Sequence, residues 1–427
     1  MKRLVCCVAV LCALTLGACA GQLEPGTVPA PTAAAAPEPS PELTPEPTPE
    51  PTPEPTPEPT PEPAAKQLEI TLRAEQKVDA LLDGEFSTCC SLPAGATITV
   101  SAAEPIGGLY LVWYDRPRDW TLEANGTAVA AGGNGMMHEF AALGESASEC
   151  SIRLGDGAAV RLSEISAFSP GTPPDWVQVW RESDSPADIL VVPTHADDEF
   201  VFFGGLLPLY AGEQGLEVQL VYTISHYGSL RERCDELLNA LWHAGVRRYP
   251  IVNDAPDREI YSIGEAEWTY GQNGFTDFLV EQIRRFRPLV VVTHDEGGEY
   301  RQGVHMLTAR SVERAVELAA DADYLPETAA RLGVWDTPKT YLHLYGPEEE
   351  RTALDYETPL AAFEGKTAFA VAEEALAMHA SQKELHFRVY ESGHAYDSHS
   401  FGLFRSLVGP DTEKNDLTEN LGAVERR

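Results

Sequence analysis

Short apolar runs alternate with longer segments of helical periodicity throughout the C-terminal part of the chain. A β-branched run that ends at a turn and leads into a helix is the repeating unit of an α/β domain. The alternation predicts a Rossmann-like layered, mostly parallel sheet with right-handed crossovers over residues 188–427. No Gly-x-Gly-x-x-Gly follows the first run, so a dinucleotide is not expected. The predicted strands are 189–193, 217–223, 249–252, 289–293 and 340–345, and the predicted helices are 230–243, 275–286, 306–320 and 367–384.

Residues 66–170 have a different pattern, in which apolar and polar positions alternate and Gly- or Asp-containing breaks follow at short intervals. This pattern predicts many short strands and an all-β sandwich or jelly-roll domain. The order of its strands loosely resembles the discoidin or galactose-binding-like domains that are often joined to carbohydrate enzymes. Trp113, Tyr114 and Trp120 are therefore candidates for a sugar-stacking face. The alternative is that most of these rings fill the core of the sandwich.

The N-terminal residues precede both predicted domains. Residues 1–21 read as a signal peptide, with a basic start and a short apolar stretch. The residues around Cys19 resemble a bacterial lipobox, which implies lipid attachment at that sulfur and an extracytoplasmic, lipid-anchored protein. The alternatives are an ordinary cleaved signal peptide and an uncleaved anchor. Residues 22–65 form a Pro-, Glu- and Thr-rich tract, expected to be a disordered, extended linker, and residues 171–187 form the junction between the two domains.

The net charge limits which partners the protein can bind, and the cysteine positions limit which disulfide bonds it can form. The net charge of −35 makes nucleic-acid binding improbable, because phosphate contacts need basic patches. It also disfavours docking onto anionic lipid, which leaves the lipidated Cys19 as the expected membrane contact. In an exported protein, a disulfide between Cys150 and either Cys89 or Cys90 is plausible. Cys234, in a helical pattern, is expected to be a buried apolar side chain.

Two polar clusters carry the candidate chemistry, and each follows a predicted strand. The first, Thr194–Glu199, contains His195, Asp197 and Asp198 before a predicted helix that begins near Phe200. The two Asp residues could simply cap this helix, since carboxylates are stabilising at helix N-termini. Capping alone would not require the His.

The second cluster, Thr293–His305, favours a metal site over capping alone. It follows the apolar run 289–292 and again opens a predicted helix. Because ligands bind at the carboxyl ends of strands in open α/β sheets, His195, Asp198 and His305 can come together there. Two His and one carboxylate with an open fourth position is the composition of a catalytic zinc site.

These motifs resemble those of the zinc-dependent GlcNAc-phosphatidylinositol de-N-acetylase family, also called PIG-L or LmbE-like deacetylases. The family's Ala-His-Pro-Asp-Asp-Glu motif is matched by Thr194–Glu199, and its His-Pro-Asp-His-like motif by Gln302–His305. The resemblance implies that His195, Asp198 and His305 bind zinc, that Asp197 is the general base, and that Tyr300 helps to stabilise the oxyanion.

One position departs from the family pattern. Gln302 replaces the first His of the second motif, which is a general acid or an oxyanion partner in the family. Gln can donate a hydrogen bond but cannot deliver a proton near neutral pH, so turnover is slowed, the protein only binds, or a residue such as His294 substitutes.

The remaining candidates lie between and beyond the two motifs. Arg233 matches a family Arg-x-x-Glu-x-x-x-Ala pattern and would hold a substrate hydroxyl or anion, unless it pairs with Glu236 on a solvated helix face. His294 is also a candidate for binding substrate. Asp257 is a weaker polar candidate, and His226 is expected to be exposed unless it reaches the cleft. The C-terminal stretch Tyr396–Phe404 is a candidate lid.

The expected function is therefore metal-dependent N-deacetylation, the hydrolysis of a linear amide on a GlcNAc-like amino sugar or glycan at the cell surface. The alternatives are a glycan-binding surface protein whose deacetylase fold has low or lost activity, and a zinc amidase with a non-sugar substrate.

Overall fold

The structure, a computed structural model, describes residues 63–226 and 231–422. The predicted signal peptide, Cys19 and nearly all of the Pro-rich tract lie outside these residues. Within residues 63–226 and 231–422, no helix combines the length and apolarity that crossing a membrane requires.

The N-terminal part of the described chain is built from antiparallel strands. In the described residues these form an eight-stranded sheet of order β1-β8-β4-β7-β5-β6, with β2 paired to β4 and β3 to β8. Two strands are longer than the short strands that the sequence pattern predicts, because register shifts at Ser101 and Ile106 let β4 bend and continue. The strands are β1 (Gln67–Leu68), β2 (Ile70–Arg73), β3 (Cys90–Leu92), β4 (Thr97–Trp113), β5 (Trp120–Ala124), β6 (Thr127–Gly132), β7 (His138–Leu154) and β8 (Val160–Phe168).

Two of the three candidate sugar-stacking rings belong to the core of this β-rich part. Trp113 and Trp120 are buried, and both indole N–H groups donate to the same oxygen of Glu139, at 2.7 and 2.9 Å. The ring of Tyr114 lies under the Arg161 guanidinium, 4.2 Å from the ring centroid. A sugar-stacking face built on the two Trp rings is therefore wrong, since neither ring is available at the surface.

The cysteines of the described residues are all free thiols. Cys90 and Cys150 lie buried on strands β3 and β7, Cys89 is half-buried, and Cys234 is buried on a helix. The expected disulfide to Cys150 is not formed, and its thiol packs into the apolar core instead.

The C-terminal part contains a mixed sheet that is mostly parallel, as the alternating pattern predicts. Its order in the described residues is β11-β10-β9-β12-β13-β15-β14, and the first five strands are parallel. Strand β15 lies between β13 and the edge strand β14 and runs antiparallel to both, so the stretch Phe401–Phe404 pairs with β13 and is not a lid. The strands are β9 (Ile189–Val192), β10 (Val218–Tyr222), β11 (Ile251–Val252), β12 (Val290–Thr293), β13 (Lys339–His343), β14 (Thr352–Ala353) and β15 (Ser400–Ser406).

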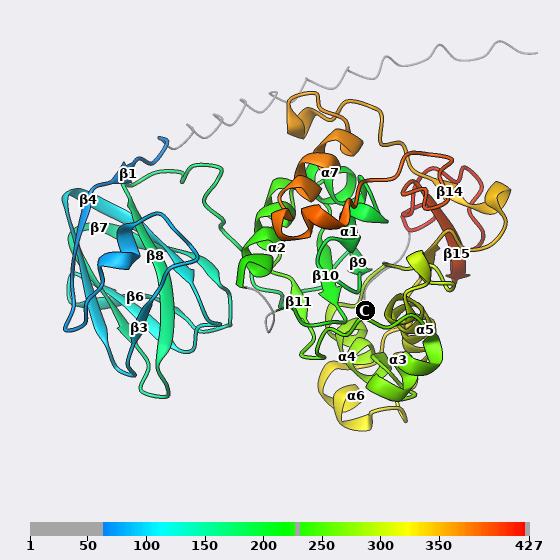
Figure 1. Cartoon of the computed structure of the whole chain (residues 1–427), viewed down its shortest axis with the longest axis horizontal. Helices are drawn as coiled ribbons and strands as arrows, with labels where there is room; N and C mark the ends of the chain where they lie inside the picture. The colour runs from blue at the N-terminus through cyan, green and yellow to red at the C-terminus, as the bar shows by residue number, and fades with distance from the viewer. Residues whose placement is uncertain (1–62, 227–230, 423–427) are drawn as a thin grey trace, which may run out of the picture. The chain divides into compact units, whose positions relative to one another are not determined.

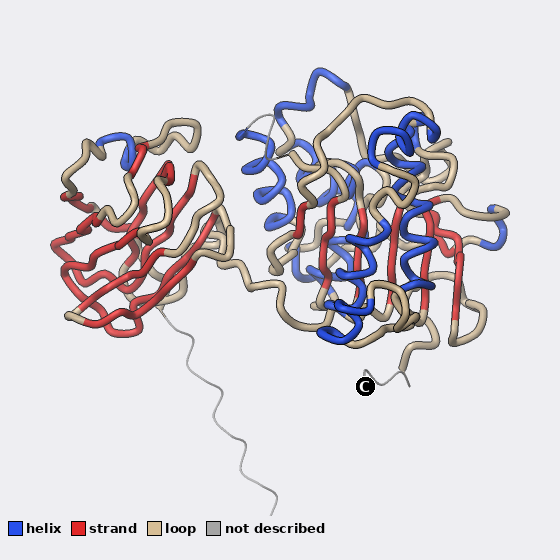
Figure 2. The backbone as a smooth tube through the Cα atoms, turned by 90° about the horizontal axis from the view of Figure 1, so that it is seen from below, coloured by secondary structure: helices blue, strands red, loops and turns tan. Residues whose placement is uncertain are grey.

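Helices cover both faces of this sheet, which explains why strands β9, β10, β12 and β13 are buried at every position, including polar ones such as Gln219 and Thr340. Ile189 and Val191 pack with α1, α2 and α7, whereas Leu190 and Val192 pack with α3, α4 and α5. Figure 1 shows these two helix groups on opposite sides of β9–β11, and in Figure 2 the helices alternate with the strands of this part. The helices are α1 (Asp198–Val201), α2 (Arg231–His243), α3 (Ile263–Tyr270), α4 (Thr276–Phe286), α5 (Gly303–Leu318), α6 (Pro326–Leu332) and α7 (Ala368–Ala377).

The long helix predicted at 367–384 is instead two elements. Helix α7 ends at Ala377, and a 3₁₀ helix follows at Ala380–Leu385. Between them His379 leaves the helical region, with a ψ of 59°, and its ring is buried beside Phe200. Burial of this one side chain therefore overrides the continuous helical pattern.

The sheet brings the two polar clusters together. Strands β9 and β12 are parallel neighbours in register, with Val192 opposite Thr293, so the loops after them begin side by side. Thr308 of α5 ties the first loop in place, because its hydroxyl bonds those of Thr194 and Thr223, each at 2.8 Å. The site therefore lies at the carboxyl ends of the central strands.

Candidate metal centre and active-site cleft

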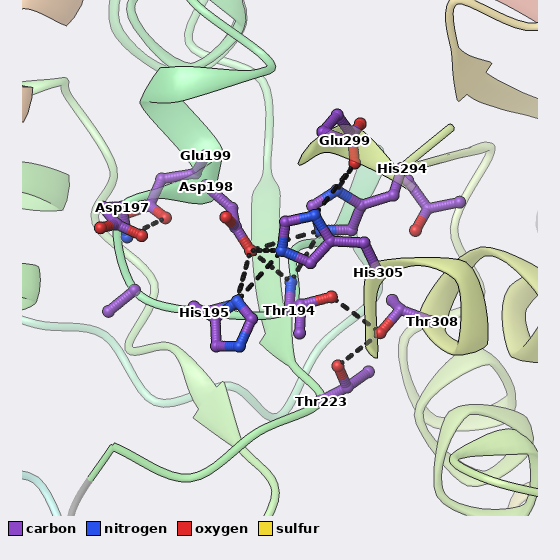
Figure 3. A network of polar contacts seen from close by, with 12 residues as sticks. Thr194, His195, Asp197, Asp198, Glu199, Thr223, His294, Glu299, His305 and Thr308 are labelled. Carbon is purple, nitrogen blue, oxygen red and sulfur yellow. Dashed lines mark hydrogen bonds and ion pairs between the residues drawn. The ribbon is translucent and has the colours of Figure 1, made fainter. Parts of the chain in front are cut away.

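Three side-chain atoms converge at the carboxyl ends of β9 and β12. His195 Nδ1 lies 3.1 Å from His305 Nε2 and 3.3 Å from Asp198 Oδ2, and the latter two atoms are 3.5 Å apart. Figure 3 shows the three groups pointing toward one another. Tetrahedral zinc ligands at roughly 2.0–2.2 Å from the metal lie about 3.3–3.6 Å from each other. The three atoms, His195 Nδ1, His305 Nε2 and Asp198 Oδ2, form a triangle whose spacing fits such an ion.

The electrostatics of this triangle also favour a cation. Burial lowers the pKa of His195, but Asp198 and Asp257 outweigh it and raise that pKa to about 10. Burial raises the pKa of Asp198, yet His305 and His195 hold it well below its usual range. The carboxylates therefore favour a positive charge at this point, which a divalent cation could supply in place of the His195 proton.

Helix capping does not explain the two Asp residues. Asp198 Oδ2 accepts from the backbone N–H groups of Thr194 and His195, at 3.2 and 2.6 Å, which lie before the helix rather than in its first turn. Asp197 occupies the N-cap position of α1, but its φ is 117° and its side chain makes no capping bond. The alternative that both carboxylates only cap the helix is therefore wrong.

A buried carboxylate behind the triangle orients its histidines. Glu299 Oε2 accepts from Nδ1 of His294 at 2.8 Å and of His305 at 3.2 Å (Figure 3). Its other oxygen, Oε1, lies 2.7 Å from Nδ1 of His343. A proton on His305 Nδ1 leaves the Nε2 lone pair facing the site, as metal-binding His residues require. The sequence analysis did not single out Glu299 or His343. Their positions after two predicted parallel strands could have indicated that both side chains lie near the site.

His294 belongs to the buried layer around Glu299 that supports the triangle, and it does not line the cleft. It is fully buried, its Nε2 accepts from the Thr194 N–H at 2.9 Å, and its ring stacks on His305 at 4.3 Å. The prediction that His294 binds substrate, or replaces the missing general acid, is therefore corrected, because both ring nitrogens are already engaged with the protein.

A cleft of about 510 Å³ opens onto the triangle. Asp197 lies on its floor next to the presumed ligands, and its Oδ2 is buried with no hydrogen-bond partner among the described residues. Burial and the neighbouring Asp198 raise the pKa of Asp197 to about 7. The lining residues are His195, Asp197, Asp198, Val201, Phe202, Arg233, Asp257, Arg258, Glu259, Tyr300, Gln302, His305, Gln382, Leu385 and Phe387.

Arg233 and Asp257 form a charged wall of the cleft. Arg233 Nη2 donates to the Ala196 carbonyl at 2.9 Å, and its Nη1 lies 3.8 Å from Asp257 Oδ2. Glu236 accepts from Ser381 instead, so the alternative of an Arg233–Glu236 surface pair is not realised. His226 is buried rather than exposed, and burial together with Arg233 lowers its pKa to about 3.

Tyr300 and Gln302 reach the cleft from the loop between β12 and α5. Tyr300 has a φ of 56°, a backbone conformation that L-residues with bulky side chains rarely adopt. Gln302 is half-buried at the N-cap of α5, and its Oε1 has no hydrogen-bond partner in the described part of the chain. Its amide can therefore turn toward a ligand in the cleft.

A further wall comes from a segment that sequence reasoning did not connect with the site. Gln382, Leu385 and Phe387 line the cleft although they follow the last motif residue by a long stretch of chain. Leu385 is 57% exposed, an unusual state for a large apolar side chain at a polar site. No local motif marks these residues, since only the fold brings them here.

Comparison with known proteins places the site in a family. Residues 190–316 match the family model described as PIG-L, GlcNAc-PI de-N-acetylase. A 1D-myo-inositol 2-acetamido-2-deoxy-alpha-D-glucopyranoside deacetylase 1 of Catenulispora acidiphila is 32% identical over 188 residues, covering 36% of this chain and 54% of the relative. A deacetylase of the same description from Geodermatophilus obscurus is 27% identical over 260 residues, covering 51% and 87%. The chain thus spans about half the length of the first relative.

Among solved structures, the N,N'-diacetylchitobiose deacetylase of Pyrococcus horikoshii is similar, with 17% identity, a TM-score of 0.33, and coverage of 47% of this chain and 70% of that one.

The family match contains both polar clusters, from His195 through His305, and the predicted family relationship is confirmed. The chain carries a domain of the GlcNAc-PI de-N-acetylase family at residues 190–316.

Proposed function

We propose that the protein is a zinc-dependent hydrolase that removes an N-acetyl group from an amino-sugar substrate. The observation that carries this proposal is the triangle of His195, Asp198 and His305 atoms, 3.1–3.5 Å apart, beside a buried Asp197 oxygen that accepts no hydrogen bond from the described residues. Both features face one cleft, where a substrate amide could meet them.

Each side chain of the cleft has a distinct task in this reaction. His195, Asp198 and His305 would hold the ion, and a zinc ion bound there supplies Lewis acidity that polarises a carbonyl and acidifies water. Asp197 takes a proton from the attacking water through its free Oδ2. The Tyr300 hydroxyl donates to the substrate oxygen that gains negative charge, which is the arrangement that stabilises acyl-transfer transition states.

The substrate class is supported by the charged wall and by the relatives. Arg233 and Asp257 offer a planar donor fork and an acceptor pair, which suit the adjacent hydroxyl groups of a sugar ring. The two curated relatives are named as deacetylases of an acetamido-glucopyranoside, and we extend an amino-sugar substrate to this chain. The β-rich part would position the catalytic domain on a glycan.

Location at the cell surface is part of the proposal. The signal-like residues 1–21, the lipobox-like Cys19 and the Pro-rich tract support export, lipid anchoring and a spacer between membrane and enzyme. Growth with a labelled fatty acid tests the anchor: the wild-type chain should carry the label, and a Cys19→Ala chain should not.

Acetate release by the full chain tests the activity. We expect release from a panel of N-acetylglucosamine glycosides, its loss after treatment with a metal chelator, and its recovery on addition of Zn²⁺. Other divalent cations, added in parallel, identify the preferred metal. A chain that binds one zinc but releases no acetate from the panel would favour a glycan-binding protein or an amide outside the panel.

Gln302 limits the rate in this proposal, because an amide cannot protonate the leaving amine. We expect Gln302→His to raise kcat by about tenfold or more, since positioned general acids typically contribute 10²- to 10⁴-fold. Gln302→Asn is the matched control, as it keeps the amide and cannot supply a proton. An unchanged kcat in Gln302→His beside an active wild type would show that another residue delivers the proton.

A further inference from the structure

Tyr300 is held by aromatic side chains that lie beyond the end of the family match at residue 316. Its hydroxyl is hydrogen-bonded to that of Tyr390, with the two oxygens 2.5 Å apart. Phe387 stacks on the Tyr300 ring at 5.7 Å and 11°, and Tyr396 meets it edge-on at 4.7 Å. One catalytic candidate is therefore fixed by three rings from the segment 387–396.

The two hydroxyl groups differ in their access to the cleft. Tyr300 lines the cleft, whereas Tyr390 lies behind it and is 8% exposed. The Tyr390 ring is itself held, because it stacks on His394 at 4.3 Å and the Arg388 guanidinium lies 5.2 Å from its centroid. Of the two residues, Tyr300 therefore lies where it can contact a substrate, and Tyr390 is its fixed partner.

The backbone at Tyr300 needs such outside support. Tyr300 and Arg301 both have left-handed backbone conformations, with φ values of 56° and 60°. This conformation is unfavourable for residues with a Cβ atom. Strained backbone of this kind persists where the surrounding structure holds it, and it is concentrated at functional sites.

The direction of the hydroxyl pair matters because each phenol has a single proton. If Tyr300 donated to Tyr390, that proton would be unavailable to a substrate oxygen. If Tyr390 donates to Tyr300, the Tyr300 proton is free, and accepting a hydrogen bond makes Tyr300 a stronger donor.

We propose that Tyr390 is a positioning residue that donates to the Tyr300 hydroxyl and thereby directs the Tyr300 proton into the cleft. The inference rests on the proposed deacetylase function and deepens it. It extends the active site to the segment 387–396, which no family motif covers. In this proposal the segment sets the direction in which the Tyr300 hydroxyl donates its proton.

A double-mutant cycle in the full chain tests this role. We expect Tyr300→Phe to lower kcat by about 10²- to 10³-fold, as loss of one oxyanion donor does. Tyr390→Phe keeps the ring packing and should lower kcat by about tenfold with KM unchanged, the rate equivalent of one hydrogen bond. Because Tyr390 acts only through Tyr300, adding Tyr390→Phe to Tyr300→Phe should cost nothing further.

Tyr324→Phe is the matched control, since it removes a tyrosine hydroxyl that bonds Asp277 and lines neither the cleft nor the Tyr300 ring, and its kcat should stay near that of the wild type. The proposal would be overturned if Tyr390→Phe lowered kcat by the same factor in the wild type and in Tyr300→Phe. It would also be overturned if Tyr390→Phe left the wild-type kcat unchanged.

A measurement without substrate separates this proposal from the proposed function. In protein labelled with ¹³C at the tyrosine ζ carbons, the Tyr300 resonance is identified by its loss in Tyr300→Phe. We expect Tyr390→Phe to shift that resonance and Tyr396→Phe, which keeps the hydroxyl pair, to shift it much less. A wild type that releases no acetate would refute the proposed function, whereas an unmoved Tyr300 resonance in Tyr390→Phe would refute the positioning role.

Discussion

Replacing Asp197 with Asn is expected to lower acetate release by about 10²- to 10⁴-fold, the usual contribution of a positioned general base. Asn has nearly the same shape as Asp but cannot accept the proton of the attacking water. The Asp197 Oδ2 atom accepts no hydrogen bond from the described residues and lies 4.0 Å from Arg233 Nη2, so the substitution breaks no structural hydrogen bond at that atom and removes only this long ion pair. The variant should therefore fold and bind one zinc per chain while kcat falls, which metal analysis and acetate assays check together.

The pH dependence of the wild type follows from the same carboxyl group. Burial and Asp198 raise the pKa of Asp197 to about 7 in the metal-free protein, and a bound divalent cation would lower it by favouring the carboxylate. Because only the carboxylate can act as base, activity should fall as the pH drops through a pKa below about 7. Asp323→Asn, which changes an exposed loop carboxylate, is the control and should keep both kcat and this pH profile. Full activity in Asp197→Asn would assign the base role elsewhere.

Replacing Glu299 with Gln is expected to destabilise the α/β domain by about 3–5 kcal/mol, the cost of removing one partner from a buried ionic network. The Glu299 carboxylate is fully buried and contacts His294, His305 and His343. A Gln side chain has one oxygen and one N–H₂ group. The N–H₂ group would therefore face a histidine N–H that needs a hydrogen-bond acceptor. Denaturant unfolding should show a lower midpoint for this domain.

The same substitution should weaken zinc binding by about 10- to 100-fold, as loss of groups that orient metal-binding His residues does. Competition with a chelating indicator measures this affinity. Glu296→Gln is the matched control, because Glu296 is exposed on the same loop, and it should change neither the unfolding midpoint nor the zinc affinity. A Glu299→Gln protein with the stability and affinity of this control would show that the network is dispensable.

The three presumed metal ligands could be found from the sequence because their positions depend on short-range rules. His195 and Asp198 follow one apolar run, and His305 follows another that pairs with it directly in the sheet. Carboxyl ends of parallel strands meet at one edge, so the convergence of these residues follows once the strands are recognised. The family-like helix pattern similarly made Arg233 a candidate for binding substrate. Only the structure showed that its side chain faces the cleft and does not pair with Glu236.

Other assignments needed the tertiary structure. His294 and His305 are in the same cluster and are chemically identical, yet one lies in the supporting layer and the other in the triangle. The choice depends on Glu299, whose burial among three imidazoles results from packing between strands β12 and β13 and helix α5. The lid expected at Phe401–Phe404 is part of strand β15, because pairing with β13 satisfies its backbone groups.

Neighbouring positions along the chain specify the α/β alternation, the motifs that resemble the GlcNAc-PI de-N-acetylase family and the residues with metal-binding chemistry. The burial of the polar groups, the place of His294 behind the metal-binding triangle and the approach of Leu385 and Phe387 to the cleft depend on the tertiary structure. The physical reason is that local pattern specifies the face of a strand or helix, whereas contacts between distant segments depend on how side chains fill the space between packed elements.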